Sequence, residues 1–141
     1  MIRKLFFSLA CILMVSLVAN AQLTPKKVMD NYKFTAIREG AEAESYFIVQ
    51  DTVHQEYVDG KLLAVSKIEW LPGNRCNVIL RWMTPDVKEG PTPGDMMKIE
   101  MVSFKDDTLT LRITFKNGRS FTAKYLRSEI ESGKPRSRPM S

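Results

Sequence analysis

The residues that could carry catalysis or metal binding are few in this sequence. His54 is the single histidine among 141 residues, and Glu56 shares its face if the segment is a strand. A catalytic histidine needs a nucleophile or carboxylate in reach, and a metal site needs several ligands, so this pair identifies neither. We expect His54 to be a half-exposed strand residue, and we assign no catalytic residue, no metal ligand and no cofactor.

The two cysteines cannot pair with each other if the N-terminal apolar run is removed. Cys11 lies within the apolar N-terminal run, whose preceding residues do not fit a lipoprotein signal, and would leave with it. Cys76 begins an alternation with Val78, Leu80 and Trp82, and a free cysteine is among the most buried residue types. We therefore expect Cys76 to be a core residue, with pairing between two chains as the alternative.

Aromatic and methionine side chains are the best candidates for ligand binding. Two tryptophans end neighbouring predicted strands, and adaptable thioethers between residues 96 and 101 suit an irregular apolar ligand or a gap in the core. In a small closed barrel, packing alone is the favoured alternative, and a cavity above about 300 Å³ would favour binding instead. The candidate cavity residues are Trp70, Trp82, Met97, Met101 and Phe115.

The elements that must position these side chains are strands, because apolar and polar residues alternate over most of the chain. A Thr24-Pro25 pair predicts a short helical turn before the first strand. The longest irregular stretch, 84–95, contains several Pro and Gly residues that exclude strand structure. The predicted strands cover residues 32–38, 44–50, 53–58, 62–71, 75–83, 96–104, 108–116 and 119–127.

The turn at Asn117-Gly118 sets the register of the last two strands. A two-residue turn would mix apolar and polar residues on one face, whereas a three-residue loop over 116–118 keeps the apolar residues together and places Gly118 at the left-handed position. We predict the three-residue loop. The expected partners are Ile113 with Phe121, Leu111 with Ala123, and Leu109 with Tyr125.

Eight antiparallel strands in sequence order, joined mostly by short turns, predict an all-β, up-and-down closed barrel. The segment Gln50-Asp51-Thr52-Val53-His54-Gln55-Glu56-Tyr57, followed by Asp59-Gly60-Lys61 and Ile68-Glu69-Trp70, resembles the small exported bacterial lipocalin-like proteins of unknown function. The resemblance covers residues 32–127. It implies a lipocalin-like barrel in the cell envelope, with a central cavity as an expectation and no catalytic residues.

The N-terminus predicts export. Arg3 and Lys4 precede an apolar run over 5–19, too short for a typical spanning helix, and small residues lead to Ala21. We expect a signal helix cleaved after Ala21, no membrane span afterwards, and a periplasmic or secreted location. The expected divisions are a signal peptide at 1–21, a segment with a helical turn at 22–31, a barrel at 32–128 and a disordered basic tail at 129–141.

The net charge of +5 does not indicate nucleic-acid binding. Five bases lie in the signal and the last ten residues, so residues 22–131 carry 16 bases and 16 acids. A nucleic-acid interface needs a dense basic face.

The sequence also lacks common catalytic and metal-binding motifs. Signatures such as Gly-x-Ser-x-Gly, His-Glu-x-x-His and Cys-x-x-Cys are missing from it.

Three hypotheses of function follow. The leading one is a non-enzymatic envelope protein that binds a small apolar molecule in the barrel. The second is a structural or interaction module that contacts an envelope protein through the loop at 84–95, which is long for a hairpin connection. The third is a hydrolase or isomerase with a site in the barrel mouth, which would need polar residues gathered around His54 or paired carboxylates.

Overall fold

The computed structural model describes residues 23–40 and 43–131. The predicted signal peptide at 1–21 and most of the predicted basic tail lie outside the described residues. Within the described part of the chain, no helix is long and apolar enough to cross a membrane.

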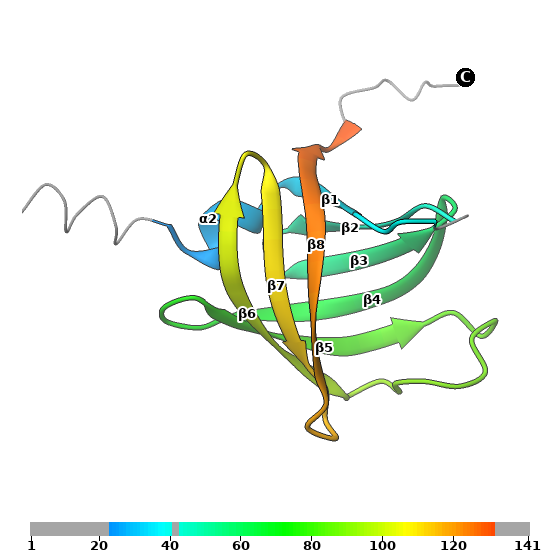
Figure 1. Ribbon diagram of the computed structural model, residues 1–141. Helices are drawn as coiled ribbons and strands as arrows, with labels where there is room; N and C mark the ends of the chain where they lie inside the picture. Colours follow the sequence, from blue (N-terminus) through cyan, green and yellow to red (C-terminus); the bar gives the residue numbers. More distant parts are fainter. Residues whose placement is uncertain (1–22, 41–42, 132–141) are drawn as a thin grey trace, which may run out of the picture.

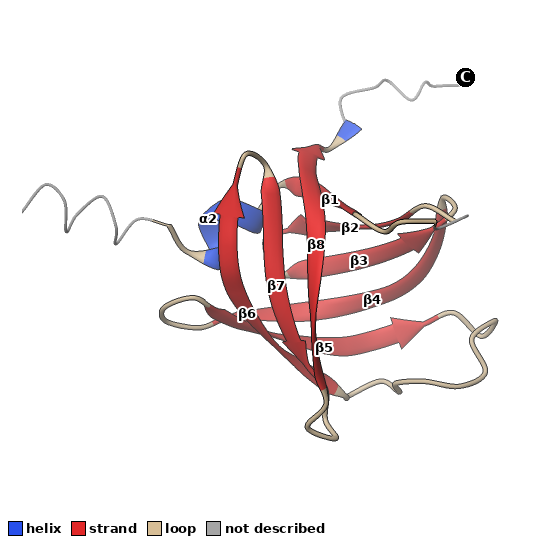
Figure 2. Cartoon of the chain, viewed as in Figure 1, coloured by secondary structure: helices blue, strands red, loops and turns tan. Residues whose placement is uncertain are grey.

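The described chain folds into a closed barrel of eight antiparallel strands (Figure 1). Each strand pairs with the next in sequence, and β8 pairs with β1 to close the sheet. Almost all of the regular structure is strand (Figure 2). This confirms the predicted all-β, up-and-down barrel. The strands are β1 (Tyr32–Ala36), β2 (Ser45–Gln50), β3 (Val53–Val58), β4 (Lys61–Trp70), β5 (Arg75–Met83), β6 (Met96–Lys105), β7 (Thr108–Thr114) and β8 (Ser120–Glu129).

The hairpin between β7 and β8 has the predicted register. Ile113 pairs with Phe121, and the pairing continues in step along both strands. The Phe115 N–H donates to the Arg119 carbonyl at 2.8 Å, which closes a three-residue loop. Gly118 has φ of 87°, the left-handed conformation that this loop type requires at its third residue. Local turn chemistry therefore determined the register of β7 against β8.

One end of the barrel is closed by a short helix, α2 (Pro25–Met29), as the Thr24-Pro25 pair predicted. The Thr24 side chain accepts a hydrogen bond from the Lys27 N–H at 3.4 Å and caps the helix. Val28 and Met29 are buried and belong to the core cluster. The helix therefore acts as a plug whose apolar face completes the core at this end of the barrel.

Arg127 holds this plug against the wall. Its guanidinium lies 4.0 Å from the ring centroid of Tyr32 and 4.4 Å from that of Phe104. It donates to the Val28 carbonyl at 3.1 Å and lies 3.6 Å from the Asp107 carboxylate. Arg127 lies on β8 and contacts one ring on β1 and another on β6. Its two cation–π contacts and one hydrogen bond thus link α2 to these three strands.

Cys76 lies in the same densely packed half of the barrel. It is almost completely buried and belongs to the core cluster, as the sequence predicted. Burial raises the pKa of its thiol to about 12, so the reactive thiolate is disfavoured. Pairing between two chains through Cys76 would require this part of the core to open.

Candidate functional site

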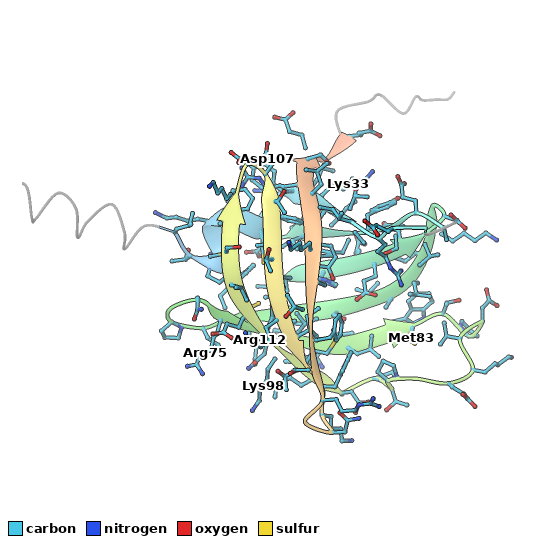
Figure 3. The ribbon with its side chains drawn as sticks, in the orientation of Figure 1. Lys33, Arg75, Met83, Lys98, Asp107 and Arg112 are labelled. Carbon is cyan, nitrogen blue, oxygen red and sulfur yellow. The ribbon has the colours of Figure 1, made fainter. Side chains whose placement is uncertain are left out.

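The other half of the barrel is hollow. A cavity of about 450 Å³ lies inside the sheet, with the side chain of Met29 from α2 contributing to its lining. It reaches the end of the barrel formed by the 84–95 loop and the β7–β8 hairpin, where Pro91 and Phe121 line it. Met83 marks this open end and Asp107 the closed end (Figure 3).

The five predicted cavity residues fall into three groups. Met97 and Phe115 line the cavity. Trp70 and Met101 point inward but pack with the core cluster towards the closed end and are not part of the lining. Trp82 lies on the outer surface, where 42% of it is exposed. The sequence thus identified inward-facing positions correctly on four of the five, without distinguishing the filled half of the barrel from the hollow half.

A β-bulge explains why the prediction for Trp82 was wrong. Ser66 pairs with Leu80, but the next residue, Val65, pairs with Trp82, so Arg81 is an extra residue on β5. A bulge of this kind reverses which side chains face inward beyond it. Met83 therefore lines the cavity in place of Trp82.

The cavity wall contains a group of aromatic rings centred on Phe47. Its ring stacks on Phe34 at 5.0 Å and on the imidazole of His54 at 4.7 Å. It meets the ring of Tyr125 edge-on at 4.9 Å and 74°. Phe115 and Phe121 stack at 5.4 Å nearer the mouth. These contacts give the cavity a firm, mostly apolar wall that suits an apolar ligand.

His54 is buried, so its predicted half-exposed position was wrong. Only 6% of the residue is exposed, and its Nδ1 has no hydrogen-bond partner among the described residues. Burial lowers the pKa of His54 to about 4, opposed by a smaller effect of its own backbone carbonyl, so the imidazole is neutral at pH 7.

The sequence did contain the signal for this burial. The predicted strands 44–50 and 53–58 leave two residues between them, and the structure pairs Gln50 with Val53 across that turn. This register puts His54 opposite Val49 and Glu56 opposite Phe47. Opposed residues share a face, so both polar side chains had to point inward with their apolar partners.

Glu56 and Tyr125 add polarity to the same cavity. Burial raises the pKa of Glu56, and burial together with the negative charge of Glu56 raises the pKa of Tyr125 to about 12. Arg38, which lines the cavity but is exposed, acts in the opposite direction on Tyr125. The cavity therefore combines apolar walls with a few convergent polar groups.

These polar groups do not form a recognisable catalytic arrangement. His54 and Ser66 are cross-strand partners, yet no hydrogen bond joins their side chains among the described residues. A histidine with a pKa near 4 is a weak general base at neutral pH. In the described part of the chain, no three His, Cys, Asp or Glu residues lie close enough to hold a metal ion.

Comparison with known proteins adds no family to this description. No protein-family model matches the chain, and no curated protein and no solved structure matches it.

Proposed function

We propose that this chain is a non-enzymatic, exported protein of the bacterial envelope that binds a small apolar molecule inside a lipocalin-like barrel. In this proposal the signal peptide is cleaved after Ala21, and the barrel acts in the periplasm or outside the cell. The export proposal depends on the N-terminal sequence, and the lipocalin-like identity on the resemblance of residues 32–127.

The observation that carries the binding proposal is the cavity of about 450 Å³. Pockets for small molecules measure about 300–1,000 Å³ and combine apolar walls with a few polar groups. A barrel of eight strands can be filled by its own side chains, so a hollow half supports a binding role over simple packing.

The 84–95 loop supports ligand access more than it supports a protein interface. It connects β5 to β6 at the open end, and Pro91 and Asp95 contribute to the cavity lining. It is also tied to the barrel wall, because the Gly94 N–H donates to the Leu80 carbonyl at 2.7 Å and the Leu80 N–H to the Asp95 carbonyl at 2.9 Å. We therefore assign this loop to the rim of the cavity.

Native mass spectrometry of the protein purified from its own envelope tests the proposal. We expect the intact mass of a chain that begins at Gln22, and we expect a fraction of the molecules to carry a small apolar compound. An Ala64→Phe variant, which places a ring in the cavity, should lose that compound. A mass beginning at Met1 would contradict export with cleavage, and no bound compound in either protein would count against ligand binding.

A further inference from the structure

Within the described ranges 23–40 and 43–131, one carboxylate inside the barrel has no side-chain partner. Glu56 lies on β3, opposite Phe47 on β2 and Ala64 on β4, and it lines the cavity. Among the described residues, its side chain makes neither a hydrogen bond nor an ion pair. Glu56 is half-buried, and a carboxylate that is partly removed from water gains stability from a partner of opposite charge.

The second carboxylate of the cavity lining shows the contrast. Asp95, at the mouth, accepts hydrogen bonds from the Thr92 N–H at 3.0 Å and from the Lys116 ammonium at 3.4 Å. Its partners lower its pKa, whereas the pKa of Glu56 is raised by burial. The deeper carboxylate is therefore the one left open for a group that the protein does not supply.

Groups near Glu56 do not neutralise it. His54, two residues away on the same face, is neutral at pH 7. Arg38 lines the cavity but is exposed, and it makes no ion pair with Glu56 within the described chain. The remaining neighbour, Tyr125, is a neutral phenol at this pH.

Aromatic rings lie beside this carboxylate. Glu56 is the cross-strand neighbour of Phe47, whose ring is stacked between Phe34 and the His54 imidazole and meets that of Tyr125 at 4.9 Å. The ring of Tyr125, whose pKa responds to the charge of Glu56, therefore remains as the aromatic neighbour of a group placed at this carboxylate. The faces of aromatic rings attract cations, and a carboxylate next to them provides a full negative charge. Together they form the kind of surface that recognises an ammonium group.

From this juxtaposition we infer that the ligand is an apolar molecule carrying a protonated amine, with the ammonium placed at Glu56 beside the ring of Tyr125. This inference rests on the proposed function, because it specifies the ligand class for the same cavity. The apolar part of the molecule would extend along the aliphatic and aromatic wall towards Phe115 and Phe121.

A matched set of probes tests the inference by calorimetric titration at pH 7. The probes are octylamine, octanol and octanoate, which share one apolar chain and differ in the charge of the head group. We expect octylamine to bind at least about tenfold more tightly than octanol, and octanoate to bind most weakly because Glu56 repels it. Equal affinity for octylamine and octanol would overturn the inference.

Three variants locate the effect. Glu56→Gln keeps the shape and removes the charge, so it should reduce octylamine affinity about tenfold and leave octanol affinity unchanged. Glu89→Gln makes the same charge change in the exposed 84–95 loop and should alter neither affinity. Arg38→Gln should leave octylamine affinity unchanged or raise it; a loss would indicate that Arg38, and not a ligand, is the intended partner of Glu56 and would contradict the inference.

The three probes also distinguish failure of the amine inference from failure of the proposed binding site. Binding of octanol without a preference for octylamine would refute the amine and leave the apolar binding site standing. Binding of none of the three probes would count against the binding site itself, and the amine inference would fall with it.

Discussion

The two ends of this barrel solve the same packing problem in opposite ways. At the closed end, α2 inserts Val28 and Met29, and Leu109 is completely buried. At the open end, Phe115 and Phe121 remain 38% and 45% exposed although they point inward. A short helix can therefore concentrate the core at one end of a barrel, so that the other end can stay hollow without loss of the fold.

The largest expected difference between the two ends follows from truncation of one inward-facing side chain at each. Leu109→Ala should reduce the free energy of unfolding by about 2–5 kcal/mol, because it leaves a cavity in a filled core. Phe121→Ala, at the hollow end, should cost less than about 1.5 kcal/mol, since its ring is already half exposed. Urea denaturation measures both. Equal losses would show that the two ends contribute alike to stability.

His54 makes stability depend on pH. Burial lowers its pKa from 6.5 to about 4, so between these values the unfolded chain binds a proton that the folded chain excludes. Burial of the neutral imidazole therefore carries no pH-dependent cost above pH 6.5. As the pH falls towards 4, the free energy of unfolding decreases by up to about 3 kcal/mol.

A His54→Phe variant isolates this dependence. Glu56 acts in the opposite direction, because its raised pKa favours the folded state at acid pH. The difference in unfolding free energy between the variant and the unmodified protein at each pH should therefore grow in favour of the variant from pH 7 to pH 4. A difference that does not change with pH would mean that the imidazole is not buried as described.

Replacing Arg127 should reduce the free energy of unfolding more than replacing Arg112, an exposed arginine that forms an ion pair. Arg127→Met removes two cation–π contacts and the donor to the Val28 carbonyl, which should cost about 1–3 kcal/mol and loosen α2. Arg112→Met removes an exposed ion pair with Glu100 at 2.8 Å and should cost less than about 1 kcal/mol. Hydrogen exchange of the Val28 amide, whose N–H bonds to the Thr24 carbonyl, would report the loosening. Unchanged protection of this amide would contradict the role of Arg127 in holding α2 against the barrel wall.

The smallest effect concerns the hairpin at the open end. Gly118→Ala forces a side chain into a left-handed position with φ of 87° and should cost about 1 kcal/mol. Ser120→Ala, two residues later at the exposed start of β8, should be close to neutral. Thermal unfolding would resolve the two, and an unaffected Gly118→Ala would indicate a different turn conformation.

Most of the fold could be predicted from the sequence because the signals were local. Alternation identified the eight strands, and Asn117-Gly118 gave the register of the last hairpin. The limits of elements were less accurate: β1 ends at Ala36 and β7 at Thr114, two residues earlier than predicted, whereas β8 continues to Glu129. Strand ends depend on where neighbouring strands stop pairing, which local sequence does not encode.

The candidate site could be predicted only in part. Met97 and Phe115 line the cavity, but the bulge at Arg81 turned Trp82 outward, and no Gly or Pro marks that bulge. The polar residues of the cavity were missed for another reason. His54 and Glu56 were judged by their own polarity, whereas the two-residue turn before β3 forces them to share the inward face of Phe47 and Val49.

We propose that the open half of the barrel is a ligand site. Calorimetric titration of octanol into the unmodified protein, Ala64→Phe and Val65→Phe tests it most directly, because Ala64 lines the cavity whereas the adjacent Val65 lies outside that lining. We expect measurable binding to the unmodified protein and to Val65→Phe, and at least about a tenfold loss in Ala64→Phe with its fold retained. Equal binding by all three proteins, or binding by none, would contradict a ligand site inside the barrel.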